Sequence, residues 1–306
     1  MVKTHTYRGV AWIDLESPTD DEASNVVKRY GLHPLVGEEL KRASTVAKAE
    51  FYDDYSLIVL TLPVRKSKGS GYEIANREID FVIGKNFLIT SRTDTIDQLE
   101  YFGKVFEANS ILNKDDRIEH AGFIFYYMVK RIYAGMIEDL ENIRDSLLLA
   151  ETRIFAGDER KMVEVLSGLS RELIDFRQIV RVHSEVWQTM VEKAGGFFGG
   201  DFGSYIRDIR DEFSAIHELI ANARELLADL RETNDSLLST KQNEIIKVLT
   251  LVAFIFYPLT FITAIFTVPA QNVPIIGSPW GWWGLVIAMG LLTALMWWYF
   301  KKRRWI

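Results

Sequence analysis

The chain has 306 residues, a net charge of −6 and no cysteine, so disulfide frameworks, Cys-ligated zinc, iron–sulfur clusters and thiol nucleophiles are excluded. Residues 245–306 carry five Lys and Arg and no Asp or Glu, which leaves 31 basic against 42 acidic residues, a charge of −11, in residues 1–244. This asymmetry excludes a uniformly soluble globule and indicates a C-terminal membrane segment.

A cytoplasmic mixed α/β domain is predicted over residues 1–115. Runs of apolar residues bounded by turn residues predict strands, and the capping residues at 17–19 predict a helix over Asp20–Tyr30. The predicted strands are Val10–Leu15, Tyr55–Val64, Asn76–Ile83 and Asn86–Thr90, with a turn at Lys66–Gly71 and a hairpin across Gly84–Lys85. With the helices that follow, these elements indicate the α+β class.

Residues 116–246 are predicted to form long helices and a stalk. Gly122–Gly157 and Asp158–Ala194 are amphipathic, and the glycine-rich segment Gly195–Gly203 follows them. A helical pattern then runs from Tyr205 to Phe266, 62 residues, or about 93 Å of helix. A helix of this length requires partners alongside it, as coiled coils and oligomeric stalks provide.

Residues 247–306 are predicted to be a two-helix transmembrane domain. Val248–Phe266 and Gly281–Phe300 are uncharged and long enough to cross the hydrocarbon core of a bilayer. Aromatic residues flank the second span at both ends, as is typical of the two membrane interfaces. Basic residues precede the first span and follow the second, and the loop between them is uncharged. Both termini are therefore expected in the cytoplasm, in an inner-membrane protein.

One face of the first span collects its small and hydroxyl-bearing side chains. Steps of three and four residues give the row Asn243, Ile246, Thr250, Ala253, Tyr257, Thr260, Ala264 and Thr267. This row has two interpretations: close helix packing through small residues, or a water-filled path shared by several copies and lined by hydroxyls and amides. Because neither span contains an acidic residue, a cation on such a path would keep its water, which Mg²⁺ surrenders reluctantly.

Short stretches spread over nearly the whole chain resemble one family. The strongest are Asn243–Thr263 (NEIIKVLTLVAFIFYPLTFIT) and Tyr299–Ile306 (YFKKRRWI), and the weaker ones are Trp12–Leu15, Leu32–Leu35, Phe51–Tyr55 and Gly84–Thr90. They are similar to the CorA family of magnesium and divalent-cation channels. The resemblance implies a homopentamer with a cytoplasmic funnel and an inner ring of stalk helices continuous with the pore. It places on or near the pore Asn243, Ile246, Leu249, Thr250, Ala253, Tyr257 and Thr260, to which the row above adds Ala264.

The sequence departs from the family's Gly-Met-Asn signature at the outer end of the first span. A gapless comparison places Thr267, Val268 and Pro269 there, and Gln271 and Asn272 supply the nearest amides. This segment is the expected equivalent of the family's filter. The resemblance therefore implies the fold and the assembly, while selectivity for magnesium is left open.

The family is also gated by cations that acidic side chains bind between cytoplasmic domains. The candidates here are Asp208, Asp211 and Glu212 on the stalk, facing Asp94 or Asp97 of a neighbouring copy. The alternative is that these acids are solvated or paired with basic residues at helical spacing.

A basic cluster follows the second span: Lys301, Lys302, Arg303 and Arg304. It is interpreted as an anchor to lipid phosphates, in preference to a basic collar at the inner mouth of the pore.

Enzymatic and nucleic-acid functions are not expected. The five histidines lack paired metal-ligand spacing and no serine lies in a GxSxG motif. A charge of −11 argues against nucleic acid as a partner. Taken with the family resemblance, the sequence predicts a homopentamer that moves divalent cations (Mg, Co, Ni or Zn) passively across a lipid bilayer, without a cofactor. The alternative is a membrane-anchored scaffold, or a non-selective or tension-responsive channel, that kept the fold and lost divalent transport.

Overall fold

The computed structural model describes residues 1–7, 9–43, 46–68, 71–94, 96, 99–105, 120–267 and 280–303. The chain divides into two compact units, Met1–Glu232 and Thr233–Ile306. The boundary between the two units falls inside one long helix. It does not coincide with a boundary of the predicted regions 1–115, 116–246 and 247–306, so those regions stay a prediction.

A six-stranded sheet forms the centre of the first unit. Its spatial order is β1-β2-β6-β5-β4-β3, and only β2 and β6 pair in parallel. The strands are β1 (Val2–Tyr7), β2 (Val10–Glu16), β3 (Lys48–Phe51), β4 (Tyr55–Lys68), β5 (Gly71–Gly84) and β6 (Phe87–Arg92). The predicted strands and the Gly84–Lys85 hairpin are confirmed.

The predicted turn at Lys66–Gly71 is too wide. β4 and β5 stay paired along their whole length, up to the partners Lys68 and Gly71. The polar composition of this ribbon's end masks its strand character, because the backbone ladder of a two-stranded ribbon tolerates polar side chains that face water. The turn is therefore shorter than the sequence indicates.

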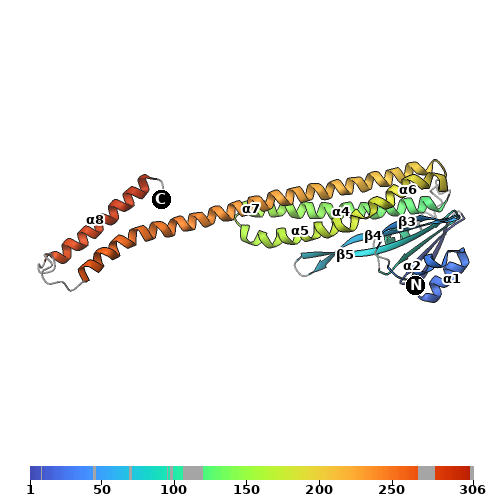
Figure 1. Ribbon diagram of the computed structural model, residues 1–306, viewed down its shortest axis with the longest axis horizontal. Helices are drawn as coiled ribbons and strands as arrows, with labels where there is room; N and C mark the ends of the chain where they lie inside the picture. The colour runs from blue at the N-terminus through green and yellow to red at the C-terminus, as the bar shows by residue number, and fades with distance from the viewer. Residues whose placement is uncertain are drawn as a thin grey trace. The chain divides into compact units, whose positions relative to one another are not determined.

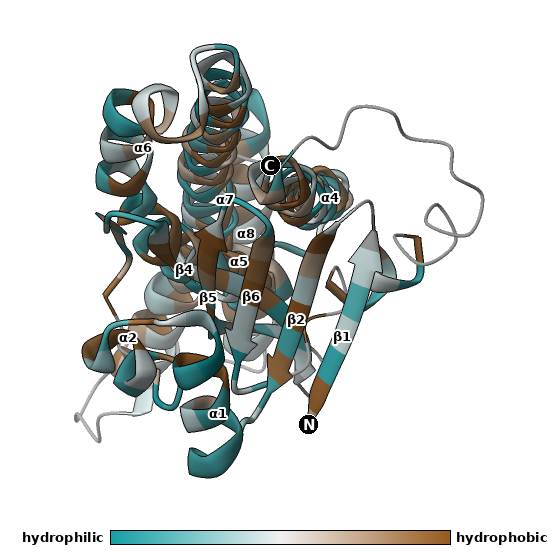
Figure 2. Cartoon of the chain, turned by 90° about the vertical axis from the view of Figure 1, so that its right-hand side faces the viewer, coloured by the Kyte–Doolittle hydropathy of each residue, from teal (hydrophilic) through white to brown (hydrophobic). Residues whose placement is uncertain are grey.

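Two short helices, α1 (Asp20–Tyr30) and α2 (Pro34–Glu39), cover one face of the sheet (Figure 2). The start of α1 is the predicted one: the Thr19 hydroxyl accepts from the backbone of Glu22, and the Glu22 carboxylate accepts from the backbone of Thr19. A core cluster joins the two helices to the sheet. It includes Ile13, Leu15, Val26, Leu32, Val36, Leu40, Leu57, Val59, Val82 and Ile89.

Long helices cover the other face of the sheet (Figures 1 and 2). They are α4 (Ala121–Phe155), α5 (Glu159–Arg181) and α6 (His183–Phe198). The ring of Phe81 on β5 meets that of Phe125 on α4 edge to face, with centroids 5.1 Å apart. The next residue of β5, Val82, points to the opposite face, where it belongs to the core cluster under α1 and α2. This follows from the alternation of side chains along a strand.

The predicted helix Asp158–Ala194 is wrong in one respect, because it is two helices that meet at Val182. The break lies where His183 bonds to the backbone of β4. The glycine-rich segment also interrupts the chain less than predicted: α6 continues to Phe198 and ends at Gly199, whose φ of 108° suits glycine.

The longest helix is α7 (Phe202–Thr267), 66 residues, which confirms the predicted helix over 205–266. In the first unit its buried side chains recur every three or four residues, as expected for a helix with one apolar face. These are Phe202, Ile206, Ile209, Phe213, Ile216, Ile220, Ala223, Leu227 and Leu230. Near its start, α7 packs against α4 through aromatic rings, among them Phe123 with Phe202 and Tyr205.

The second unit contains the C-terminal part of α7 and α8 (Gly281–Lys302). Both helices are long and apolar enough to cross a membrane, and the most apolar window of each is only 6% buried within the protein. Apolar side chains without protein cover suit a lipid environment. The two predicted spans are therefore matched by two candidate membrane helices.

Candidate ion pathway and acidic sites

The predicted pore row lies on an open face of α7 in the second unit. Tyr257 is 75% exposed and Ile246 is 53% exposed. The other exposed members are Asn243, Thr260, Ala264 and Thr267, while Thr250 and Ala253 are partly buried. Leu249, which the family resemblance places near the pore, is exposed too. The residues therefore share a face that the chain itself leaves largely uncovered.

A different face of α7 packs against α8, which runs alongside it (Figure 1). Leu251 on α7 and Phe300 on α8 are both buried, and the ring of Phe254 lies 6.4 Å from that of Phe300. Besides Ala253 of the row, the partly buried positions beyond Leu251 are Ile255, Pro258, Leu259 and Ile262, and these four form a stripe with Leu251. At about 100° per residue, this stripe and the pore row point to roughly opposite sides of the helix. The position of α8 thus leaves the row accessible to further copies of α7.

The threonine hydroxyls of the row are oriented by their own helix. Thr250, Thr260 and Thr267 each donate to a backbone carbonyl of the preceding turn, over 2.8, 2.9 and 2.8 Å. Each hydroxyl proton is therefore directed at the backbone, so the oxygen presents lone pairs to its surroundings. Oxygen lone pairs are what a hydrated cation's shell, or the cation itself, requires.

The filter-equivalent segment is described only at its first residue. Thr267 is exposed and is the last residue of α7. Val268, Pro269, Gln271 and Asn272 lie outside the described residues.

The basic cluster at the end of α8 is described as far as Arg303, and Arg304 lies outside. The Lys301 ammonium lies 4.8 Å from the centre of the Trp297 ring, and that of Lys302 lies 5.1 Å from the Trp298 ring. Each of these cation–π contacts places a charged ammonium group against an apolar aromatic ring. They suit a helix end at a membrane interface, as the anchor interpretation requires.

Two of the predicted regulatory acids share one lysine of their own chain. Lys130 on α4 lies 2.8 Å from Asp208 Oδ2 and 2.9 Å from Glu212 Oε1. The Tyr126 hydroxyl donates to the same Asp208 oxygen over 2.7 Å. The hydrogen bonds from Lys130 and Tyr126 hold the pKa of Asp208 below its ordinary value. Burial and the bond to Asp208 raise the pKa of Tyr126 to about 12.

The remaining predicted acids are placed apart from this pair. Asp211 is exposed and bonds to its neighbour Arg210 over 3.0 Å. Asp94 forms an ion pair with Arg77, and Asp97 lies outside the described residues. Within the described part of one chain, no group of three or more His, Asp and Glu is placed to hold a metal ion.

Lys130 and Tyr126 are partners of these acids that the sequence does not predict. They precede Asp208 by 78 and 82 residues. A lysine and a tyrosine on an amphipathic helix carry no local signal of a partner that far along the chain. Only the packing of α4 against α7 brings them to the acids.

Together, the fold and the exposed apolar helices define a membrane protein with a large α/β unit and a two-helix membrane anchor. Residues 7–302 match the sequence model of a protein family described as “CorA-like Mg²⁺ transporter protein”. The chain belongs to this CorA-like family of divalent cation transporters.

Individual relatives agree with this assignment. The chain is 25% identical to the cobalt/magnesium transport protein CorA of Thermotoga maritima, over 96% of this chain and 83% of the relative. It is 24% identical to the protein of the same name in Methanocaldococcus jannaschii, over 96% and 91%. The solved structure of the CorA magnesium transporter of M. jannaschii matches with a TM-score of 0.83 and 22% identity, covering 97% of this chain and 92% of the other. These relatives are transport proteins, which agrees with the expectation of a non-enzymatic function.

Proposed function

We propose that the chain forms a homopentameric channel through which divalent cations move passively down their electrochemical gradient. Mg²⁺, Co²⁺, Ni²⁺ and Zn²⁺ are the candidate ions. The names of the relatives, cobalt and magnesium transport proteins, support this choice. The channel lies in the inner membrane with both termini in the cytoplasm, as the basic flanks of the two spans and the uncharged loop between them favour.

The observation that carries the proposal is the position of the pore row on α7. The row is largely open, and the buried stripe with Leu251 lies on roughly the opposite side of the helix. Copies related by rotation about one axis bring the same surface of each copy to that axis. Five α7 helices arranged with their rows inward would line a path with Asn243, Thr250, Tyr257 and Thr260, while α8 faces lipid.

The chemistry of the row favours a cation that keeps its first water shell. The described parts of both spans contain no carboxylate, so the path offers hydroxyl, amide and backbone oxygens. Hydrogen bonds from the water shell of Mg²⁺ to such oxygens avoid the cost of removing that shell. At the outer mouth, Thr267 with Val268, Pro269, Gln271 and Asn272 takes the place of the filter. The amides of Gln271 and Asn272 supply its strongest acceptors.

We further propose that Asp208, Asp211 and Glu212 bind a regulatory cation together with Asp94 or Asp97 of a neighbouring copy. Lys130 already neutralises Asp208 and Glu212 within one chain. A divalent cation at this position therefore competes with the Lys130 ammonium. Lys301, Lys302, Arg303 and Arg304 hold the end of α8 at the lipid phosphates.

The test is divalent flux into liposomes that contain the purified protein, with the oligomeric state checked by native mass spectrometry. Thr260→Leu and Asn243→Leu place an apolar side chain on the row and are expected to abolish flux. Thr263→Leu is the matched control, because Thr263 is an exposed threonine of the same turn that bonds to its own helix but lies off the row. Equal loss in Thr260→Leu and Thr263→Leu, or no flux from a confirmed pentamer, contradicts the proposal.

A further inference from the structure

Asp80 on β5 is a buried carboxylate with an unsatisfied oxygen. Its relative exposure is 4%, and its Oδ1 atom is fully buried without a hydrogen-bond partner among the described residues. It lies on the same face of the sheet as Val59 and Val82, at the margin of the apolar cluster under α1 and α2. A buried charge in such a place is costly unless a partner or a proton neutralises it.

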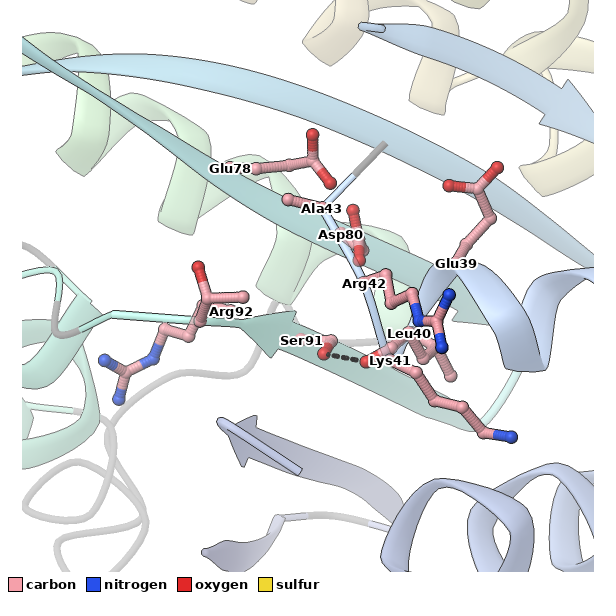
Figure 3. A pocket seen from close by; sticks show the side chains of 10 residues that line it. Glu39, Leu40, Lys41, Arg42, Ala43, Glu78, Asp80, Ser91 and Arg92 are labelled. Carbon is pink, nitrogen blue, oxygen red and sulfur yellow. Dashed lines mark hydrogen bonds between the residues drawn. The ribbon is translucent and has the colours of Figure 1, made fainter. Parts of the chain in front are cut away.

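The charged groups around Asp80 do not neutralise it. Figure 3 shows the carboxylate in a small cavity between Glu78 of its own strand and Glu39 of α2, beneath the segment that follows α2. The charge of Lys48 on β3 acts on Asp80, but the Lys48 ammonium lies 2.5 Å from Glu39 and 3.3 Å from Glu50.

Three basic residues line the cavity: Lys41, Arg42 and Arg92. Lys41 bonds to Glu38, and Arg92 turns away to Asp14 and Glu16. Arg42 is exposed at the rim.

The surroundings of Asp80 favour its neutral, protonated form. The described residues offer no group of three or more His, Asp and Glu placed for a metal. Burial is the main cause that raises the pKa of Asp80 well above its ordinary value, and the charges of Glu78 and Glu39 raise it further.

The nearest hydrogen-bond donor by strand register is Ser91. Ser91 on β6 is the direct antiparallel partner of Asp80 on β5, so the two side chains point to the same face, with Cβ atoms about 5 Å apart. In the structure the Ser91 hydroxyl instead donates to the carbonyl oxygen of Leu40, the residue that caps the C-terminal end of α2, over 2.8 Å (Figure 3). This buried bond ties the end of α2 to β6.

We propose that Asp80 and Ser91 form a proton-controlled latch on α2. While Asp80 is neutral, the Ser91 hydroxyl holds Leu40. When Asp80 loses its proton, the buried carboxylate requires a donor, and the Ser91 hydroxyl turns from Leu40 to Asp80. The end of α2 and the segment 41–43 then loosen. Lys48 reaches the Asp80 carboxylate only by breaking its ion pair with Glu39. That ion pair links β3 to α2, so this second response loosens α2 as well.

Hydrogen exchange of the full-length protein in lipid nanodiscs, followed by mass spectrometry from pH 5 to 9, tests the latch. After correction for the intrinsic pH dependence of exchange, amides of residues 36–43 are expected to exchange roughly tenfold faster at the alkaline end, the factor of one lost hydrogen bond. The segment 140–155 of α4 serves as the internal reference and is expected to keep its protection.

Three variants separate the latch from general loosening. Asp80→Asn cannot ionise and is expected to remove the pH dependence. Ser91→Ala is expected to give fast exchange of residues 36–43 at every pH. Ser56→Ala is the matched control, because Ser56 is a buried serine of the same sheet on the opposite face, and it is expected to behave as the wild type.

Two outcomes overturn the latch. One is the same pH profile in the wild-type protein and in Asp80→Asn. The other is restored protection on addition of Mg²⁺ at pH 9 in the wild type but not in Asp80→Asn, which would mean that a metal ion rather than a proton neutralises Asp80.

Discussion

The Nε2 atom of His183 on α6 lies 2.7 Å from the carbonyl oxygen of Thr61 on β4. A carbonyl only accepts, so Nε2 carries the proton and Nδ1 accepts from the Tyr133 hydroxyl at 3.1 Å. The Tyr133 oxygen in turn accepts from the indole nitrogen of Trp187 over 2.6 Å. This fully buried chain of bonds fixes the neutral tautomer of His183 and ties the α5–α6 junction to the sheet.

Acid is expected to weaken this junction. Burial lowers the pKa of His183 to about 4, below its ordinary value near 6.5. The neutral histidine therefore contributes fully to stability above pH 6.5, and the contribution is lost as the pH falls from 6.5 through 4. The loss is on the order of 3 kcal/mol of unfolding free energy. Thermal unfolding of the wild type and His183→Gln between pH 4 and 8 measures it. A slope that persists unchanged in His183→Gln assigns the acid sensitivity to another group.

Removal of the Tyr133 hydroxyl is expected to destabilise the first unit by roughly 1–3 kcal/mol, because Tyr133→Phe leaves Trp187 Nε1 and His183 Nδ1 buried without their partner. Chemical denaturation followed by circular dichroism measures the change. Tyr101→Phe removes the same atom from a half-exposed ring and serves as the control, with an expected change near zero. Equal effects of the two substitutions would contradict the role of the buried network.

Arg65 and Glu172 form a buried ion pair whose halves are expected to depend on each other. Arg65 Nε donates to Glu172 Oε2 over 2.9 Å, and the two side chains are 9% and 6% exposed. Arg65→Met leaves the Glu172 carboxylate buried without its cation, at an expected cost of about 3–5 kcal/mol. The double variant Arg65→Met, Glu172→Met removes both charges and is expected to recover most of that loss. Additive losses in a double-mutant cycle would show that the pair is not coupled.

Lys130→Gln is expected to increase the response of the protein to divalent cations. Asp208 and Glu212 lose the ammonium that neutralises them, so the pKa of Asp208 rises and a metal ion no longer competes with a lysine. The shift in unfolding temperature on addition of Mg²⁺ is therefore larger in the variant than in the wild type. The control is Lys161→Gln, which removes a lysine from an exposed pair with Asp158. Identical Mg²⁺ responses in all three proteins would argue against a cation at these acids.

Local signals in the sequence predict much of the fold. The capping box at Thr19 and Glu22 marks the start of α1, and the unbroken periodicity from Tyr205 predicts nearly all of α7. The break between α5 and α6 has no such signal, because Val182 is flanked by neither glycine nor proline and a contact with β4 accompanies the break.

Polar side chains in the interior are equally hidden from the sequence. Asp80 occupies a strand position that looks solvent-facing, and it is buried only because α2 and the segment after it cover the end of the sheet. The pairing of Asp208 with Lys130 likewise depends on the packing of two helices that are far apart in sequence. The pore row, in contrast to these polar side chains, follows a local spacing of about 3.6 residues. The sequence therefore predicts that its members share one face of α7, but it does not predict what surrounds that face in an assembly.

The absence of cysteine from the chain allows the most direct test of the central claim, that the row on α7 lines a water-filled cation path. Single cysteines at Ala253, Tyr257 and Ala264 on the row are compared with cysteines at Val252 and Thr263 off the row. Divalent flux into liposomes is measured before and after a positively charged, membrane-impermeant thiol reagent is added to both sides. We expect the reagent to block flux through the row variants and to spare the other two. Block without regard to position, or block only off the row, would contradict it.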